Sequence, residues 1–443
     1  MQKNAIAIGV ALCVMGVGSS YAQNPSKVEL WGVVDAAIRH TNNHGATGGN
    51  QTQMIGGGMS QSRWGLNVEE DLGQGSKALV HLEHRFNADN GAKDATAPFF
   101  QLSYVGLQGP YGRITAGRQW NVLFDVVSST YASFPYSPYM EAYKPELGMA
   151  VGARTSNALK YTFATPSRNF VGGLQYSFDE KNRTEAFIQD VNAVSQRAGG
   201  AAAQQAVAAG AQAGLDPTTI ARNAQLAAQQ AGAQAAQAYM LANRDEIVQI
   251  GLGAMRTAGG FLRFSQSGFS VGGAYLKTTL PGRSSVDAWT MGGSYRSGPW
   301  YVNLGYGENK FKASGGTFSV AVDRMYLNDA WSSPNNGGFQ AGDANKRRMA
   351  KVGFGYQATS NINLGLHYYH AKQSGSATGA YNGKADFIVA ALDYQFSKRT
   401  DAYVAVDHTK LKGGSGMSID AISTSQPAVK SRTGFTVGLR HRF

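Results

Sequence analysis

Residues 433–443 read TGFTVGLRHRF. Apolar side chains occupy every second position of this segment, at Phe435, Val437 and Leu439, and threonine, glycine or arginine stands between them. A period of two is typical of a β-strand, because successive side chains point to opposite faces of the sheet. One apolar face over about ten residues indicates a strand of a membrane-spanning β-barrel. We therefore expect the face of Val437 to meet lipid and the face of Arg440 to line the interior.

The same alternation recurs along the rest of the chain. In residues 62–69, Trp64 and Leu66 oppose polar or charged residues, and residues 79–86 repeat the pattern. Short turns such as 295–299 join neighbouring segments into hairpins, whereas longer polar connections separate the hairpins, as in outer-membrane barrels. We predict an all-β fold, a transmembrane antiparallel β-barrel of 16 strands, with approximate spans 27–39, 61–70, 76–87, 99–108, 111–119, 156–165, 169–178, 254–265, 268–278, 286–297, 299–310, 346–357, 361–371, 385–396, 400–410 and 433–443.

Two alternatives to this count and class stay open at the level of sequence. Boundaries that shift by a few residues would change the count to about 14 or 18 strands. A soluble β-sandwich or β-helix also uses many short alternating strands. Aromatic residues at the strand ends, including the final Phe443, favour the barrel, since aromatic girdles border its lipid-facing band.

The composition excludes other classes of protein. Charged residues make up 15% of the chain and aromatic residues 11%, which argues against disorder. Residues 1–22 resemble an export signal, with Lys3, an apolar stretch and a Ser20-Tyr21-Ala22 cleavage site. Beyond this signal no apolar run of about 20 residues remains, so a helical membrane protein is excluded. The only cysteine, Cys13, lies within the signal, so we expect no disulfide in the exported chain.

The chain carries a series of ordered motifs, which are VELWGVVD at 28–35, SRWGL at 62–66, EDLGQG at 70–75, YVGL at 104–107, GRITAGRQ at 112–119 and the closing segment 434–443. Together they resemble the general porins of the Gram-negative outer membrane in their β-proteobacterial form. The resemblance implies a homotrimer of 16-stranded barrels, integral to the outer membrane, through which small hydrophilic solutes and ions pass by passive diffusion. It also implies that the third loop folds into the lumen as a constriction.

Residues 120–153 form the candidate third loop. A connection of this length in a compact fold is usually functional or disordered, and its prolines and aromatic residues favour order. Its PELG sequence at 145–148 is similar to the Pro-Glu-Phe-Gly-Gly loop tip of the family. We predict Glu146, Glu141 and Asp125 as acidic residues of the constriction. The alternative is that they are solvated loop charges with no selective role.

Basic residues are predicted to face this loop across the lumen. Alternation places Arg63 opposite the lipid-facing stripe, puts Arg85 on the face of Glu83 and directs Arg154 into the interior. The resemblance implies constriction roles for Arg63 and Arg154, whereas Arg85 depends on alternation alone. Acidic loop groups opposite basic wall groups would select ions through a transverse field. The net charge of +12, or +11 without Lys3, suggests mild anion preference; ordinary pairing of these arginines with lumen carboxylates is the alternative.

Basic residues are also predicted on the outer face of the barrel. Arg118 matches a family arginine, yet alternation turns it outward, where a charge is costly in lipid, so we predict a subunit interface there. Lys346 and Arg348 also lean outward, towards the expected lipopolysaccharide phosphates, while Arg347 and Lys351 lean into the mouth. A solvated rim would explain this second cluster equally well.

The family resemblance does not account for residues 185–250. Between residues 198 and 242, 19 of 45 residues are alanine, and half of the others are glutamine or glycine. Alanine and glutamine favour helices, and the GLDP sequence at 214–217 indicates a stop followed by an N-cap and a proline at the first helical position. We predict two helices, 186–213 and 217–243, inserted in the fourth extracellular loop. A partial lid, an adhesive surface, a shield for the mouth and a tolerated insertion all remain open as roles.

An enzyme is the main competing class outside transport. The GFSVG sequence at 268–272 fits the Gly-x-Ser-x-Gly pattern, but it continues as a strand and not as the helix that a nucleophile elbow requires. His81 and His84 lie three residues apart, so strand alternation sends them to opposite faces and prevents a shared metal site. We predict no enzymatic activity, no cofactor and no metal.

Within transport, a substrate-specific channel for a sugar or an aromatic acid is the alternative. Aromatic residues of the candidate third loop could stack on a sugar ring, or they could pack the loop against the wall. A structural or adhesive protein, the third class, would need a plugged lumen. The aromatic residues concerned are Tyr131, Phe134, Tyr136, Tyr139 and Tyr143.

Overall fold

The computed structural model describes residues 26–44, 48–93, 98–133, 153–179, 181–243, 246, 255–314, 345–376, 382–413 and 430–443. The predicted export signal at 1–22 and residues 134–152 of the candidate third loop lie outside the described residues.

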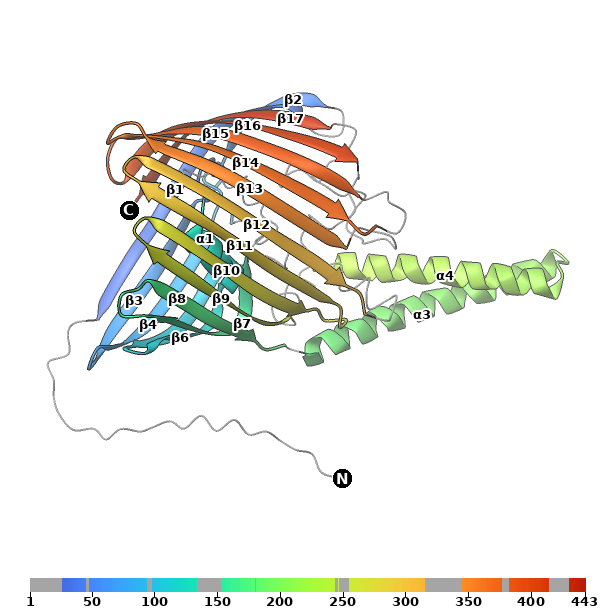
Figure 1. Cartoon of the computed structure of the whole chain (residues 1–443). Helices are drawn as coiled ribbons and strands as arrows, with labels where there is room; N and C mark the ends of the chain where they lie inside the picture. Colours follow the sequence, from blue (N-terminus) through green and yellow to red (C-terminus); the bar gives the residue numbers. More distant parts are fainter. Residues whose placement is uncertain are drawn as a thin grey trace.

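One antiparallel sheet closes into a barrel. With the exception of β2 and β3, strands that follow one another in the chain pair with each other, and β1 pairs with β17 to complete the ring. Short turns gather at one end of the barrel and the long connections at the other (Figure 1). The strands are β1 (Lys27–His44), β2 (Gly49–Ile55), β3 (Arg63–Gly73), β4 (Ser76–Arg85), β5 (Phe100–Gly109), β6 (Gly112–Trp120), β7 (Arg154–Ala164), β8 (Phe170–Ser177), β9 (Arg256–Gln266), β10 (Phe269–Thr279), β11 (Ser285–Ser297), β12 (Trp300–Lys312), β13 (Lys346–Gln357), β14 (Ile362–Ser374), β15 (Gly383–Gln395), β16 (Thr400–Gly413) and β17 (Ser431–Arg442).

Strands β2 and β3 share one position of the barrel. β3 pairs with β1 over Lys27–Val33, and β2 pairs with the same strand over Ala37–His44, whereas β17 occupies the other edge of β1. The 17 strands therefore fill 16 positions, and the predicted 16-stranded barrel is confirmed. None of the spans predicted from the sequence includes β2.

A buried carboxylate holds the segment that interrupts this strand position. The Asp35 side chain accepts hydrogen bonds from the backbone N–H groups of Gly58 and Met59 at 3.1 Å and of Ser60 at 2.6 Å. The Tyr403 hydroxyl of β16 donates to the same carboxylate. Because one side chain satisfies three backbone donors, the strand is interrupted without leaving these groups unpaired.

The two faces of the barrel differ as the alternation predicted. On β17 the side chains of Val437 and Leu439 are 44% and 54% exposed on the outer face, whereas Thr436 and Arg440 are buried on the inner face. Apolar side chains exposed in this way on strand after strand make the outer surface suited to hydrocarbon. The apolar face is therefore outside and the polar face inside.

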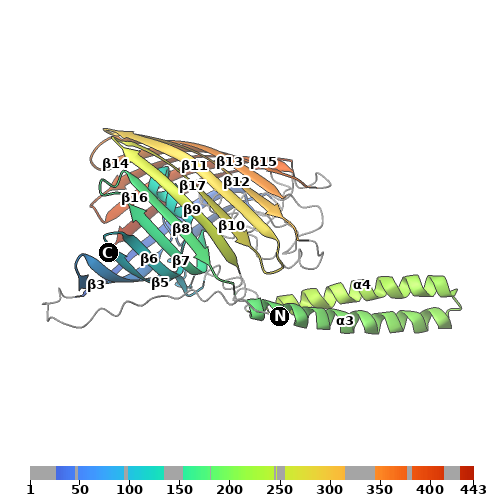
Figure 2. The ribbon, with the colours of Figure 1, turned by 60° about the horizontal axis from the view of Figure 1, so that its bottom comes forward.

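Two long helices project from the end of the barrel that carries the long connections, α3 (Lys181–Gln212) and α4 (Pro217–Ala242). They run antiparallel as a hairpin that points away from the barrel (Figure 2). Asp216 caps α4 by accepting from the N–H groups of Thr218 and Thr219 at 3.0 Å. Small residues let the helices approach closely, since a Cβ on Gly199 would lie 2.8 Å from the Ala228 carbonyl oxygen. The predicted helical insertion is confirmed.

Among the described residues, no helix has both the length and the hydropathy that a membrane-crossing helix requires.

Candidate functional site

A short helix, α1 (Val122–Thr130), lies inside the barrel and begins the candidate third loop (Figure 1). It starts at this point because the Asn121 side chain caps it, accepting from the Phe124 N–H at 3.0 Å. One face of α1 is apolar and packs on inward-facing apolar residues of the wall, which are unusual in a polar lumen. The buried cluster contains Val122, Leu123, Val126, Val127 and Tyr131 from the helix and its end, with Ala274, Leu276, Leu280, Val286, Ala288 and Phe311 from the wall.

Glycines in the wall make room for this helix. A Cβ at Gly292 would lie 2.6 Å from the Tyr131 ring, and one at Gly305 would lie 2.7 Å from the other edge of that ring. A Cβ at Gly272 would lie 2.9 Å from Val126. Gly272 is the last residue of the GFSVG sequence, so packing of α1 explains a glycine there.

Hydrogen bonds continue to hold the chain after α1 ends. The Tyr131 hydroxyl bonds to Thr290 Oγ1 on β11, and the Tyr301 hydroxyl on β12 donates to the Ala132 carbonyl oxygen at 2.7 Å. The Ser133 and Tyr369 hydroxyls are also bonded, which reaches β14. The Tyr131 ring is fully buried, so it packs the loop against the wall and offers no face to a solute. The other four aromatic candidates of this loop lie outside the described residues.

An ion pair fixes the opposite side of α1. Lys160 on β7 points inward, and its Nζ lies 2.7 Å from Asp125 Oδ2 and 2.9 Å from the Trp120 carbonyl oxygen. Burial raises the pKa of the Asp125 carboxyl, and the Lys160 ammonium opposes that rise. Asp125, a predicted constriction residue, is thus neutralised by a wall lysine.

Three predicted basic residues converge on one carboxylate. Glu83 Oε2 lies 3.6 Å from Arg63 Nε, and Glu83 Oε1 lies 3.6 Å from Arg85 Nε and 3.8 Å from Arg154 Nη2. The Glu83 side chain is only 5% exposed. Among the residues that the structure describes here, three guanidinium groups around one carboxylate give a local excess of positive charge on the luminal wall. We call these four residues the arginine cluster.

Aromatic rings connect the arginine cluster to α1. The Arg154 guanidinium lies over the Trp120 ring at 3.6 Å from its centroid, and that ring stacks on Phe124 at 3.6 Å. A guanidinium on an indole face is stabilised by the ring quadrupole. The helix and the cluster are therefore parts of one arrangement, although they come from distant segments of the chain.

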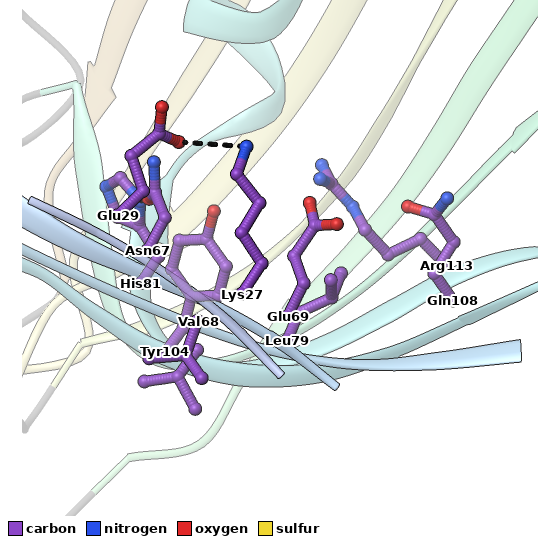
Figure 3. A pocket seen from close by; sticks show the side chains of 11 residues that line it. Lys27, Glu29, Asn67, Val68, Glu69, Leu79, His81, Tyr104, Gln108 and Arg113 are labelled. Atoms are coloured by element: carbon purple, nitrogen blue, oxygen red, sulfur yellow. Dashed lines mark hydrogen bonds and ion pairs between the residues drawn. The ribbon is translucent and has the colours of Figure 1, made fainter. Parts of the chain in front are cut away.

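A recess of about 220 Å³ lies on the luminal wall nearer the short turns (Figure 3). Charges of both signs line it, with Lys27 and Arg113 on one hand and Glu29 and Glu69 on the other. Beside it the Trp31, His81 and Tyr104 rings form a stack, with centroid separations of 5.9 Å and 5.1 Å. The Arg63 guanidinium of the arginine cluster lies 5.9 Å from the centroid of the Trp31 ring. The ring stack therefore connects the arginine cluster with the recess.

On the neighbouring strands β1 and β15 to β17, inward arginines lie beside carboxylates. Arg39 pairs with Asp407 at 2.6 Å, and Arg440 lies 2.9 Å from Asp401 and 3.7 Å from Asp393. Each of these arginines has at least one carboxylate of its own. Arg442 also pairs with Asp401, so two arginines share that carboxylate. Among the described ion pairs, three arginines around one carboxylate occur only in the arginine cluster.

The structure brings together Arg63, Arg85 and Arg154 around Glu83. Glu141 and Glu146 lie outside the described residues. Glu83 was considered from the sequence only as an ordinary pairing partner. The sequence did contain a signal that Glu83 faces the lumen, because it stands between His81 and Arg85, which alternation also directs inward.

Arg118 lies on the other face of the sheet from Glu83. Arg118 pairs across strands with Ser103, and Ser103 pairs with Leu82. Because Leu82 is adjacent to Glu83 in the chain, Leu82 and Arg118 share the face opposite Glu83. Arg118 Nη1 donates to Ser156 Oγ at 2.8 Å. The outward direction agrees with the predicted alternation.

Residues 9–414 match the family model for Gram-negative porins. The chain belongs to the Gram-negative porin family. The porin is 30% identical over 209 residues to an outer membrane porin protein of Bordetella pertussis, a match that covers 41% of the chain and 50% of that protein. It is 32% identical over 191 residues to outer membrane porin protein 32 of Delftia acidovorans, covering 41% and 51% respectively. The porin spans about half the length of these curated relatives.

A solved structure supports the same fold. The anion-selective porin from Comamonas acidovorans superposes with a TM-score of 0.62, covering 95% of this chain and 100% of that one, at 22% sequence identity. At this identity the likeness shows the fold alone. Family membership also confirms the prediction that the porin is not an enzyme.

Proposed function

We propose that this porin forms a water-filled channel in the outer membrane of a Gram-negative bacterium and lets small hydrophilic solutes and ions diffuse passively. The observation that carries this proposal is the arginine cluster, a charged and inward-facing group inside a barrel whose outer face is apolar. Charged groups on an inner wall are stable only where water or a counter-ion reaches them.

We propose a mild preference for anions. The arginine cluster carries more positive than negative charge, and the described ion pairs of the neighbouring strands β1 and β15 to β17 are closer to balance. In a narrow gap with low-dielectric walls such an excess raises the local concentration of anions. The description of the Comamonas porin as anion-selective is in keeping with this preference.

The inward loop completes the proposed constriction. Helix α1 occupies part of the lumen, and Asp125 is engaged with Lys160. We therefore assign the acidic side of the constriction to Glu146 and Glu141, on the part of residues 120–153 that follows α1. These carboxylates would face the arginine cluster and set a transverse field.

A homotrimer is the proposed assembly. The outward Arg118 supports it, because a guanidinium on the lipid face is costly unless another protein surface covers it. Loops at the end of the barrel that carries α3 and α4 would then lie outside the cell, where lipopolysaccharide forms the outer leaflet.

A channel with a preferred solute is the second candidate. The ring stack of Trp31, His81 and Tyr104 beside the recess favours it, since aromatic faces and mixed charges suit a sugar or an aromatic acid. Saturable block of conductance by an oligosaccharide, lost in Tyr104→Ala, would support it. Conductance that depends linearly on solute concentration would support the general pore.

Reversal potentials in planar bilayers under a KCl gradient test the main proposal. We expect stepwise insertion of conducting units and a reversal potential on the anion side of zero. Arg63→Gln should move the potential towards zero, whereas the matched variant Arg168→Gln, in the exposed turn between β7 and β8, should not. Absence of conductance would refute the channel, and clear cation selectivity would refute the anion preference.

A further inference from the structure

A row of basic residues crosses four neighbouring strands on the outer face of the barrel. Arg348 on β13 lies directly opposite Lys372 on β14, Lys372 lies opposite Lys384 on β15, and Lys384 lies opposite Lys412 on β16. Adjacent strands are about 4.8 Å apart, so four positive charges follow one another in a line. We call these four residues the basic row.

The basic row faces outward, away from the lumen. In each strand a residue adjacent in the chain is buried on the inner wall, namely Arg347, Gln373, Ala385 and Leu411. Lys372, Lys384 and Lys412 are exposed, and the Arg348 side chain is 43% exposed. All four residues stand within three positions of the end of their strands at the long-connection end of the barrel.

Like charges directly opposite each other destabilise a sheet unless anions lie between them. Arg348 has such a partner, because its Nε lies 2.8 Å from Glu308 Oε2 on β12. Lys346 also uses that carboxylate, at 2.8 Å from Oε1. Lys372, Lys384 and Lys412 make no ion pair with any residue that the structure describes. The three lysines therefore have no ion-paired carboxylate among the described residues, although the charges of Lys412 and Asp386 lie near enough to interact.

Along the strands from the basic row towards the middle of the barrel, the outer surface changes from basic to polar and then to apolar. Polar residues come next, starting two positions along the strands. His370 Nδ1 and the Tyr368 hydroxyl both form hydrogen bonds with Asp386, at 2.7 Å and 2.6 Å. Beyond these residues the outer face becomes apolar, with Val352 and Ile388 55% and 43% exposed. Four residues of strand separate Val352 from Arg348, about 13 Å along the strand. A molecule with anionic groups at one end and acyl chains at the other would place its anionic groups at the basic row and its acyl chains on the apolar surface.

We propose that the basic row binds the phosphate groups of the glycolipid that forms the outer leaflet, with its acyl chains on the apolar surface beneath. This inference rests on the proposed outer-membrane location and specifies the lipid contact. Phosphate is favoured because it carries more than one negative charge and accepts several charge-assisted hydrogen bonds from closely spaced cations. The contact would supply counter-charge to the three lysines of the row.

The test compares lipid binding by the full chain and by a variant with the row neutralised. The variant carries Arg348→Gln, Lys372→Gln, Lys384→Gln and Lys412→Gln. Purified protein in detergent is titrated with bisphosphorylated lipid A, and binding is measured by native mass spectrometry. We expect affinity for lipid A to fall at least about tenfold, given the usual contribution of each basic residue near an anionic surface.

Two matched variants control for charge and for folding. Lys398→Gln with Arg399→Gln removes positive charge from the short turn between β15 and β16, at the other end of the barrel, and should leave the affinity unchanged. Lys372→Arg with Lys384→Arg and Lys412→Arg keeps the charge of the row and should bind lipid A as tightly as the original chain. Both variants should show the same oligomeric state and conductance as the original chain.

Several results would overturn the proposal. Equal affinity of the neutralised variant for lipid A would do so, as would equally tight binding of dephosphorylated lipid A by the original chain. Complete displacement of lipid A by millimolar inorganic phosphate would show an anion site and not a lipid site. Loss of the oligomer with undiminished lipid affinity would make the row a contact between subunits. Conductance is measured separately, so failure of the channel proposal would be seen independently of these outcomes.

Discussion

Lys160 Nζ lies 2.7 Å from Asp125 Oδ2, and this ion pair joins the helix inside the barrel to strand β7 of its wall. The Lys160 side chain is 5% exposed and that of Asp125 22% exposed, so water only partly screens the pair. On its other side α1 packs on strands β10 to β12 through apolar contacts. The helix is therefore held by hydrophobic packing on one side and by charge on the other.

Lys160→Met is expected to loosen α1. The substitution leaves the Asp125 carboxylate without its partner in a partly buried position, which costs about 3 kcal/mol. We expect a lower free energy of unfolding in urea for the protein in vesicles and noisier open-channel current. The control is Lys77→Met, because the Lys77–Glu69 pair has exposed side chains and should contribute less than about 1 kcal/mol. Equal effects of the two substitutions would contradict the role of the Lys160 pair.

Gly292→Ala is expected to displace Tyr131 and the chain that follows α1. The new methyl group would lie 2.6 Å from the ring, and crowding of this kind costs about 1–3 kcal/mol. We expect a changed single-channel conductance, because the start of the inward loop must shift. Gly273→Ala is the matched control, since its Cβ would have no neighbour closer than 3.3 Å. Identical conductance in both variants would show that the wall glycine does not position the loop.

Glu83→Gln is expected to strengthen the anion preference. The substitution removes the carboxylate that three arginines share and so increases the positive charge at the luminal wall. The reversal potential in a KCl gradient should move further to the anion side. Asp71→Asn, in the β3 end near the short turn, is the control and should have no such effect. A shift towards cations after Glu83→Gln would be incompatible with the proposed role of the cluster.

Deletion of residues 181–242 with a short glycine-serine linker is expected to leave single-channel conductance unchanged. The hairpin of α3 and α4 points away from the barrel and not across its mouth (Figures 1 and 2). Conductance in planar bilayers measures the effect directly. A marked increase in conductance would instead identify the hairpin as a partial lid.

The cap of α4 is expected to depend on pH. Hydrogen bonds from the Thr219 side chain and backbone and from the Thr218 N–H lower the pKa of Asp216 below its ordinary value. A carboxyl with a lowered pKa stabilises the folded state above its ordinary pKa and loses that contribution as pH falls through the lowered value. Amide exchange of residues 218–224, corrected for intrinsic rates, should therefore accelerate only below about pH 4.

Asp216→Asn provides the comparison for this measurement. Asparagine also caps helices, but its side chain does not titrate. We expect protection of the first turn of α4 in this variant to remain constant across the same pH range. A step of equal size in both proteins would assign the pH dependence to another group.

Local rules account for the features that were correctly predicted from the sequence. Strand alternation is enough to place Arg63 and Arg85 inside and Val437 outside, because the face of a side chain depends only on its position along the strand. The start of α4 was also predictable, since the cap involves Asp216 and the residues directly after it. Strand β2 was missed, and so was the segment between β2 and β3, whose stabilising group, Asp35, lies on a different strand.

The sequence by itself therefore determined the class of fold, the two faces of the barrel, its helical insertion and the inward direction of the arginines. Only the tertiary structure decided that Arg63, Arg85 and Arg154 share Glu83, that Lys160 neutralises Asp125 and that Lys372 stands opposite Lys384. The reason is physical. Alternation and capping act over a few neighbouring residues, whereas these pairings depend on the register between strands and on the path of a loop through the lumen.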